Sequence, residues 1–291
     1  MMGSWLRVCV IRRSSGSCRC RRWSNFEAER AWLMTVANRK TVSGFLHVSW
    51  RTAGAVARRI AERVKASMSS PFDGLTAVGV DGTGYRKGHA YLTVVVDHER
   101  HRVIWAHGGY GGDVFDLFFK ALTPGQRESI RVVTGDGTHW IDPCTGRWCP
   151  AAERVLDGFH IVSWMTDALD GIRNTDPKGQ IYRAWQFKEL LRTLLKHPVE
   201  QARGELNHWV FRASHSRIPE IVALAKKLRR RRPDILRTIQ LGYSNARLEA
   251  SDNRIKATIR MAHGFHHVTN LIALIMLRCG GPDIRLPQPR T

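Results

Sequence analysis

The chain is 291 residues long and carries 46 Lys and Arg against 25 Asp and Glu, which gives a formal net charge of +21 at pH 7 with histidine neutral. This length accommodates one large domain and a small one, with a hydrophobic core that needs no disulfide or metal. The positive charge is spread along the chain and favours nucleic acid as the partner. An acidic membrane surface is the competing partner. Against it, no apolar run is long enough to span a bilayer, and the run at 271–277 shows only a short buried-helix pattern.

Residues 1–24 are rich in arginine and cysteine and lack the long apolar core of a secretory signal, so we expect a cytoplasmic protein. The cysteines of the whole chain are scattered and indicate no disulfide framework, which agrees with that compartment. Cys9, Cys18 and Cys20 are a possible remnant of a zinc-binding segment, although a closed structural zinc site needs four ligands.

Residues 25–68 show helical periodicity in three short units, the last beginning at Trp50 with Ser49 as its cap. Such an arrangement is typical of a helix-turn-helix, and any small helical bundle produces the same pattern. In the helix-turn-helix interpretation the last helix enters the major groove of DNA. The DNA-contacting residues would then be Arg51, Thr52, Arg58 and Arg59.

Residues 72–162 are predicted to hold most of a sheet. The β-branched runs at 77–80 and 91–96 flank a glycine-containing turn, which predicts two antiparallel strands, and a third strand is predicted at 101–105. Asp81 follows the first run directly. A turn-capping aspartate is the ordinary explanation for such a residue, and a functional carboxylate is the alternative.

Two further runs end in the same way. The run at 130–133 leads to Asp136, and the run at 154–156 leads to Asp157 and then His160. Strand ends of one sheet lie close together, and carboxylates a few ångströms apart repel one another unless they are protonated or neutralised by a cation. A bound divalent metal ion would remove that repulsion.

Residues 163–243 are helical throughout by their periodicity and include a basic run at 226–232. A solvated helix face and a phosphate-binding surface both explain such a run.

Residues 244–263 form one further predicted helix, with Glu249, Asn253, Lys256 and Arg260 in one stripe beside an apolar stripe. An ordinary surface helix also places charges beside an apolar face.

Several strings resemble the sequence blocks of the bacterial DDE transposases of the ISL-three insertion-sequence family. They are VGVDGTGYRKGHAYLTVVVDHE, VVTGDGTHWID, LDGFHIVSW and SNARLEASDNRIKATIRMAHGFH, in that order along residues 78–266, and HVSWRT at 47–52 is similar to the family's helix-turn-helix. The resemblance implies an α/β protein with a ribonuclease H-like mixed sheet flanked by helices. It also implies an all-helical insertion at 163–243 and a return to the catalytic core at 244–291.

The resemblance further assigns roles to particular residues. The acidic triad falls on Asp81, Asp136 and Glu249, which would hold two Mg²⁺ or Mn²⁺ ions for phosphoryl transfer. Supporting roles fall on Asp157, His160 and Asn253, and phosphate contacts on Lys87, Lys256 and Arg260. The implied partners are double-stranded DNA, as terminal inverted repeats and target, and further copies of the chain, with the protein associated with the nucleoid.

The chain also departs from the family pattern. Its cysteine-rich N-terminal segment is shorter, and position 82 is glycine where an acidic residue often follows the first aspartate. The helical stretch after the block at Asp157 is also shorter, with only residues 167–180 before the next helix. The shortened N-terminus and insertion motivate a rival function, a DNA-binding protein without catalysis. A site-nonspecific nuclease of the same fold is a third possibility.

Overall fold

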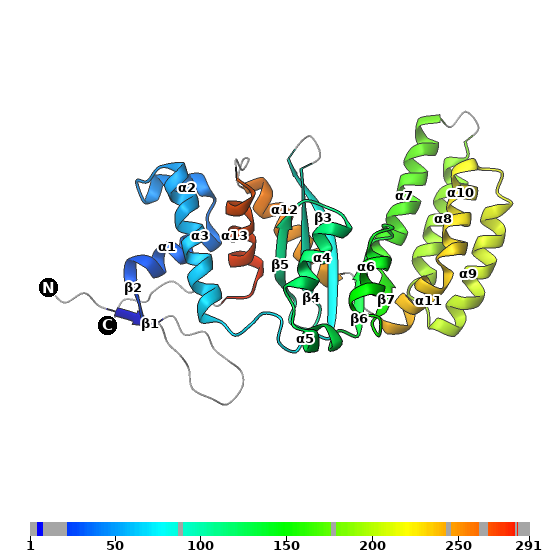
Figure 1. Cartoon of the computed structure of the whole chain (residues 1–291). Coiled ribbons are helices and arrows are strands. Elements are labelled where there is room, and N and C mark those ends of the chain that lie inside the picture. The colour runs from blue at the N-terminus through cyan, green and yellow to red at the C-terminus, as the bar shows by residue number, and fades with distance from the viewer. Residues whose placement is uncertain are drawn as a thin grey trace. The chain divides into compact units, whose positions relative to one another are not determined.

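A computed structural model describes residues 5–7, 22–86, 90–175, 179–242, 246–261, 267–282 and 284 (Figure 1). Cys9, Cys18, Cys20 and Lys87, to which the sequence assigns zinc or DNA binding, lie outside these ranges. The chain divides into two compact units. Unit 1 comprises residues 1–130 and 247–291, and unit 2 comprises residues 131–246.

Unit 1 begins with two short antiparallel strands and a group of helices. The strands are β1 (Trp5–Arg7) and β2 (Arg22–Ser24), and the helices are α1 (Asn25–Val36), α2 (Arg39–Phe45) and α3 (Trp50–Ser67). The Ser49 side chain accepts a hydrogen bond of 3.1 Å from the Thr52 backbone N–H and caps α3. The predicted helices and the predicted cap are therefore confirmed.

An antiparallel sheet forms the centre of unit 1. Its strands are β3 (Ala77–Arg86), β4 (Ala90–Asp97) and β5 (Arg102–Gly108), with β4 paired to both neighbours. The predicted antiparallel pairing is confirmed, but the prediction that a strand ends at Asp81 is wrong. Asp81 lies within β3 opposite Val94, because backbone pairing with β4 continues past Gly82 as far as Arg86.

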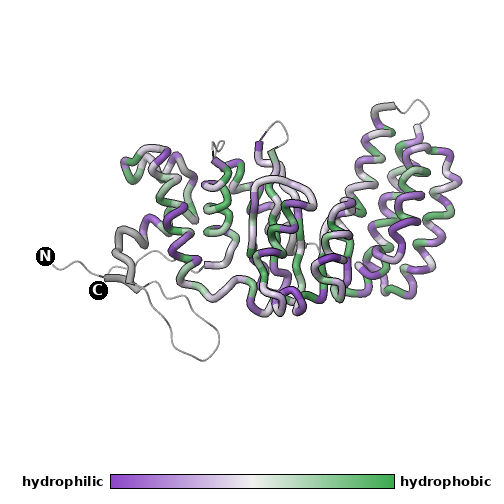
Figure 2. Tube along the Cα trace, viewed as in Figure 1, coloured by the Kyte–Doolittle hydropathy of each residue, from purple (hydrophilic) through white to green (hydrophobic). Residues whose placement is uncertain are grey.

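The remaining helices of unit 1 are α4 (Gly112–Lys120), α5 (Pro124–Glu128), α12 (Ala246–Met261) and α13 (Val268–Cys279). Helix α13 contacts both α3 and β5 (Figure 1). Helix α13 is mostly apolar (Figure 2), and buried side chains from α3, β4, β5, α12 and α13 form one core. The short apolar run at 271–277 is therefore a core helix.

Unit 2 begins with the parallel strands β6 (Val132–Gly135) and β7 (Glu153–Leu156), joined through α6 (Ile141–Trp148). The described residues that follow form five helices, namely α7 (Gly158–Thr175), α8 (Ile181–Leu194), α9 (Val199–Ser214), α10 (Pro219–Arg230) and α11 (Arg232–Leu241). The helical prediction for this region is confirmed over the described residues. Helix α6 was not predicted, because Pro143 and Gly146 interrupt its pattern.

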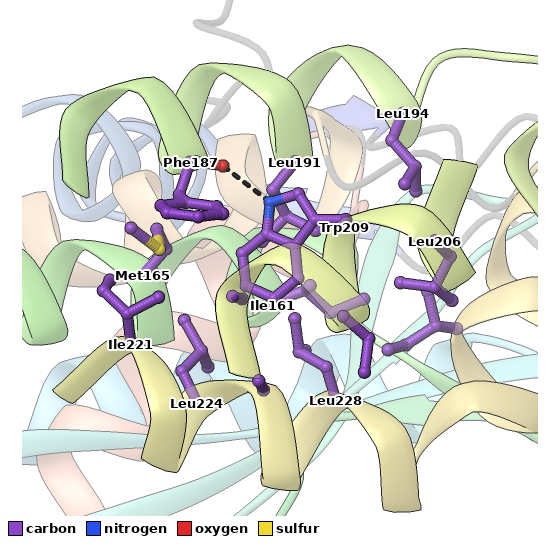
Figure 3. Close-up of a cluster of buried hydrophobic side chains, with 14 of the residues drawn as sticks. Ile161, Met165, Phe187, Leu191, Leu194, Leu206, Trp209, Ile221, Leu224 and Leu228 are labelled. Carbon is purple, nitrogen blue, oxygen red and sulfur yellow. Dashed lines mark hydrogen bonds between the residues drawn. The ribbon is translucent and has the colours of Figure 1, made fainter. Parts of the chain in front are cut away.

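The helices of unit 2 enclose a core of their own, which Figure 3 shows in close-up. Trp209 is buried at its centre, and its indole N–H donates a hydrogen bond of 2.9 Å to the Phe187 backbone oxygen. The buried indole is thereby satisfied while its ring packs edge-on against Phe187, with the ring centroids 5.6 Å apart. This core holds α7 and α10 in contact.

The protein is of the mixed α/β class, since helices flank strands that pair in both antiparallel and parallel fashion. This confirms the predicted class at that level, while the ribonuclease H-like topology, the helix-turn-helix and the domain boundaries stay predictions. None of the helices within the described ranges combines the length and apolar character needed to cross a bilayer.

Candidate functional site

Asp136 and Asp157 follow the ends of two neighbouring parallel strands in unit 2. The Asp157 backbone N–H donates a hydrogen bond of 2.9 Å to the Gly135 oxygen, so the strand ends of β6 and β7 lie side by side. The prediction that strand-end aspartates share one edge of a sheet is confirmed for this pair. Both aspartates are half-buried.

The Asp136 carboxylate is held by the turn that follows it. Its Oδ1 accepts hydrogen bonds from the Thr138 backbone N–H at 3.0 Å and from the Thr138 hydroxyl at 2.5 Å. Side-chain to backbone bonds of this kind fix the aspartate rotamer. Both hydrogen bonds that the Asp136 carboxylate accepts within the described ranges thus involve Oδ1.

Arg154 on β7 contacts this turn and is a residue that was not among the predicted site residues. Its guanidinium donates to Asp142 Oδ1 at 3.0 Å and to the backbone oxygens of Asp136 and Val155. Desolvation by burial lowers the pKa of Arg154, and the neighbouring Asp142 opposes that effect. An arginine directly before the apolar pair Val155 and Leu156 of a short strand was the available sequence signal. Its bonds to main-chain oxygens anchor the Asp136 backbone.

His160 lies on the first turn of α7, with its Nε2 3.6 Å from Asp157 Oδ2. The two residues therefore form a local pair at the same sheet edge as Asp136. Their supporting role, expected from the sequence, stays a prediction.

A tryptophan and a lysine complete this edge of unit 2. The Trp164 ring on α7 lies against Gly137, where an added Cβ would come within 2.5 Å of the ring. The Lys227 ammonium on α10 lies 3.6 Å from the centroid of the Trp164 ring. Desolvation lowers the pKa of Lys227, while Asp167 and Asp136 raise it, which places these carboxylates within electrostatic reach.

Asp81 belongs to unit 1, where it is half-buried within β3. The Gly82 backbone N–H donates a hydrogen bond of 2.8 Å to Asp81 Oδ1. Tyr110 covers the next position, since an added Cβ on Gly82 would come within 2.3 Å of its ring. A side chain at position 82 would therefore have to displace the Tyr110 ring.

Helix α12 presents one buried face and one exposed face, as predicted. Ile255 is buried and Ile259 packs against the core of unit 1, whereas Asn253, Lys256 and Arg260 are exposed. Glu249 occupies a position one turn before Asn253 on the same helix, and its side chain lies outside the described part of the structure.

The expected DNA-binding residues of α3 are all at the surface. Arg51, Thr52, Arg58 and Arg59 are exposed, while Ala53, Ala57 and Ile60 on the opposite face are buried. The Thr52 hydroxyl lies 2.8 Å from the Ser49 hydroxyl. Helix α3 therefore exposes positively charged side chains on one face, while its opposite face is apolar and buried.

Comparison with known proteins identifies the family. A family model described as a transposase, of the ISL-three type, matches residues 78–179 and 175–275. The chain belongs to the ISL-three transposase family. The matched residues include Asp81, Asp136 and Glu249, so this transposase carries all three predicted acids within the shared region.

Curated relatives agree with this membership. The transposase for insertion sequence element IS1557 of Mycobacterium tuberculosis is 28% identical over 324 residues, covering 90% of this chain and 73% of the relative. The transposase for insertion sequence element IS1001 of Bordetella parapertussis is 24% identical over 277 residues, covering 80% of this chain and 68% of the relative.

The donor atoms of this transposase suit a hard divalent cation. Asp81 and Asp136 supply carboxylate oxygens, the ligands that Mg²⁺ prefers, and each holds Oδ1 in a local hydrogen bond. Within the described residues, no three His, Cys, Asp or Glu side chains form a group that could hold a metal ion. Asp81 and Glu249 belong to unit 1 and Asp136 to unit 2, so their convergence on one site stays a prediction.

Proposed function

We propose that this protein is a DDE-type DNA transposase that cleaves and joins DNA strands at the ends of an insertion sequence. In this proposal Asp81, Asp136 and Glu249 hold two divalent metal ions, Mg²⁺ or Mn²⁺. The observation that carries the proposal is the rigid support of Asp136, whose carboxylate and backbone are fixed by Thr138 and Arg154 within the family-matched region. Preorganised ligands of this kind favour catalysis.

In this proposal, different residues of the chain bind the metal ions, support the site and contact DNA. When bound, the two ions would activate the attacking water or DNA 3′-hydroxyl and stabilise the departing 3′ oxygen. Asp157 and His160 support the edge of β6 and β7 that carries Asp136. The exposed side chains of Lys256 and Arg260 would hold DNA phosphates near Glu249. Asn253 lies between Glu249 and Lys256 on α12 and would support this site.

The other parts of the proposal concern fold and partners. Strands β3 to β7 would form a ribonuclease H-like core with the helices of unit 2 inserted before Glu249. Helices α1–α3 would act as a helix-turn-helix on the terminal inverted repeats, with Arg51, Thr52, Arg58 and Arg59 facing DNA. The protein would work in the cytoplasm on nucleoid DNA as at least a dimer, since two ends must be joined.

The test is a cleavage assay on DNA that carries the ends of the encoding element, with and without Mg²⁺. We expect Asp81→Asn, Asp136→Asn and Glu249→Gln each to lower the cleavage rate by a factor on the order of 10³ or more, since each removes a metal ligand. Asp170→Asn serves as the control, because Asp170 is exposed on α7 and its substitution removes the same charge without removing a proposed metal ligand. Cleavage by Asp81→Asn at the parent rate would refute the mechanism.

The same assay separates the rival functions. End binding that is sensitive to salt but indifferent to Mg²⁺ and to Glu249→Gln, with no cleavage by the parent protein, would indicate a DNA-binding protein only. Cleavage of any DNA without joining to target would indicate a site-nonspecific nuclease.

A further inference from the structure

The pair formed by Lys227 and Trp164 lies beside Asp136 and remains without a role in the proposed mechanism. The Lys227 ammonium is 3.6 Å from the Trp164 ring centroid, and the same ring lies against Gly137, the residue after Asp136. Both side chains are half-buried, so the ammonium is partly removed from water. The aromatic ring also limits the conformations open to the lysine side chain, which lowers the entropy cost of binding an anion there.

Three arginines near this edge of unit 2 are already committed to carboxylates. Arg154 lies 3.0 Å from Asp142, Arg231 lies 2.6 Å from Asp142 and 3.2 Å from Asp234, and Arg237 lies 3.4 Å from Glu153. Lys227 makes no ion pair within the described parts of the chain, although Asp167 and Asp136 act on it electrostatically. Its ammonium therefore stays available to an incoming anion at this edge.

The flank of α10 supplies a path by which a polyanion can reach Lys227. Lys226, Arg229 and Arg230 are exposed on the same helix, whereas Ile221, Leu224 and Leu228 are buried in the core of unit 2. A row of exposed cations that leads to a partly desolvated one suits contact with successive phosphates of a nucleic-acid backbone.

We propose that Lys227, held on Trp164, binds one backbone phosphate of the DNA strand that enters the site at Asp136. This inference rests on the proposed function for the identity of the strand. Lys227 acts as a positioning residue, because it fixes the strand and takes no part in bond making. The ligand is a DNA phosphate diester, recognised by charge and without base specificity.

The experiment measures binding of end DNA in the absence of divalent metal, with single phosphates replaced one at a time by neutral methylphosphonates. The parent protein should lose affinity several-fold at each contacted phosphate. Lys227→Met, which keeps the stem over Trp164 but removes the charge, should be insensitive to replacement at one phosphate and should retain the parent's response at the others. Lys227→Arg should restore the response at that position.

Lys226→Met is the matched control, since it removes the same charge from the next residue of α10. It should keep the parent's response at the phosphate assigned to Lys227. If Lys227→Met responds like the parent at every position, the inference is wrong, whatever the outcome of the cleavage assay. The binding assay contains no metal and therefore does not depend on catalysis. Failure of the proposed catalysis would instead appear in the cleavage assay, as cleavage by Asp136→Asn at the parent rate.

Discussion

His98 shows how burial changes a single residue of this protein. It follows β4, is 8% exposed, and lies between Asp97 and the turn to β5. Desolvation lowers its pKa from 6.5 to about 4, and the charge of Asp97 only partly offsets that effect. The imidazole is therefore neutral in the folded protein at neutral pH.

The lowered pKa of His98 predicts a loss of stability in acid. The unfolded chain binds a proton at His98 near pH 6.5, whereas the folded chain does so only near pH 4, so the free energy of unfolding falls as the pH drops through this window. The loss should reach about 3 kcal/mol at its lower end. Urea denaturation at several pH values measures it, and His98→Gln should remove this part of the pH dependence. An unchanged pH profile in that variant would contradict the prediction.

Gly137 predicts a second effect at the residue scale. An added Cβ at this position would meet the Trp164 ring at 2.5 Å, so Gly137→Ala must displace the ring. We expect a loss of about 1–3 kcal/mol in the free energy of unfolding and slower DNA cleavage, because Gly137 adjoins Asp136. Gly146→Ala is the control, since no atom lies within 4 Å of the added Cβ and alanine favours helix α6. Equal stability of the two variants would contradict the close packing of the Trp164 ring against residue 137.

At the scale of elements, the start of α3 depends on one side chain. Ser49 caps this helix through its bond to the Thr52 N–H, and α3 then packs against α13 through its buried face. Ser49→Ala should lower the free energy of unfolding by about 1 kcal/mol, because a helix-end N–H loses its partner. Chemical denaturation checks this value, and Ser49→Asn should remain close to the parent. Equal losses in both variants would argue against a capping role.

At the scale of the whole molecule, the net charge of +21 predicts that the affinity for DNA depends strongly on salt concentration. Under the proposed function, the logarithm of the DNA association constant should fall linearly with the logarithm of salt concentration, losing a factor on the order of 10³ between 50 and 200 mM for about six phosphate contacts. Fluorescence anisotropy with labelled end DNA measures the slope. Replacing Arg58 and Arg59 together by glutamine should reduce the slope by up to about 2. An affinity independent of salt would contradict a backbone-dominated interface.

Features that depend on interactions between residues close in sequence were mostly predicted correctly, and features that depend on residues far apart in sequence were not. The helices of unit 2, the cap at Ser49 and the β3–β4 pairing depend on local periodicity and turn residues, and they were predictable. The extent of β3 was not, because its glycines continue the strand only when β4 supplies hydrogen-bond partners. Helix α5 is an exception, because its capping box of Thr123 and Gln126 is a local signal and the helix was nevertheless not predicted.

The sequence by itself determined the family, the candidate acids and the cationic character of this transposase, because these depend on which residues are present and in what order. Only the tertiary structure placed Arg154 beneath Asp136 and Lys227 on Trp164. Trp164 and Lys227 come from α7 and α10, which the core of unit 2 brings together. Their contact depends on packing between residues far apart in the chain, and no periodicity or spacing in the sequence encodes that packing directly.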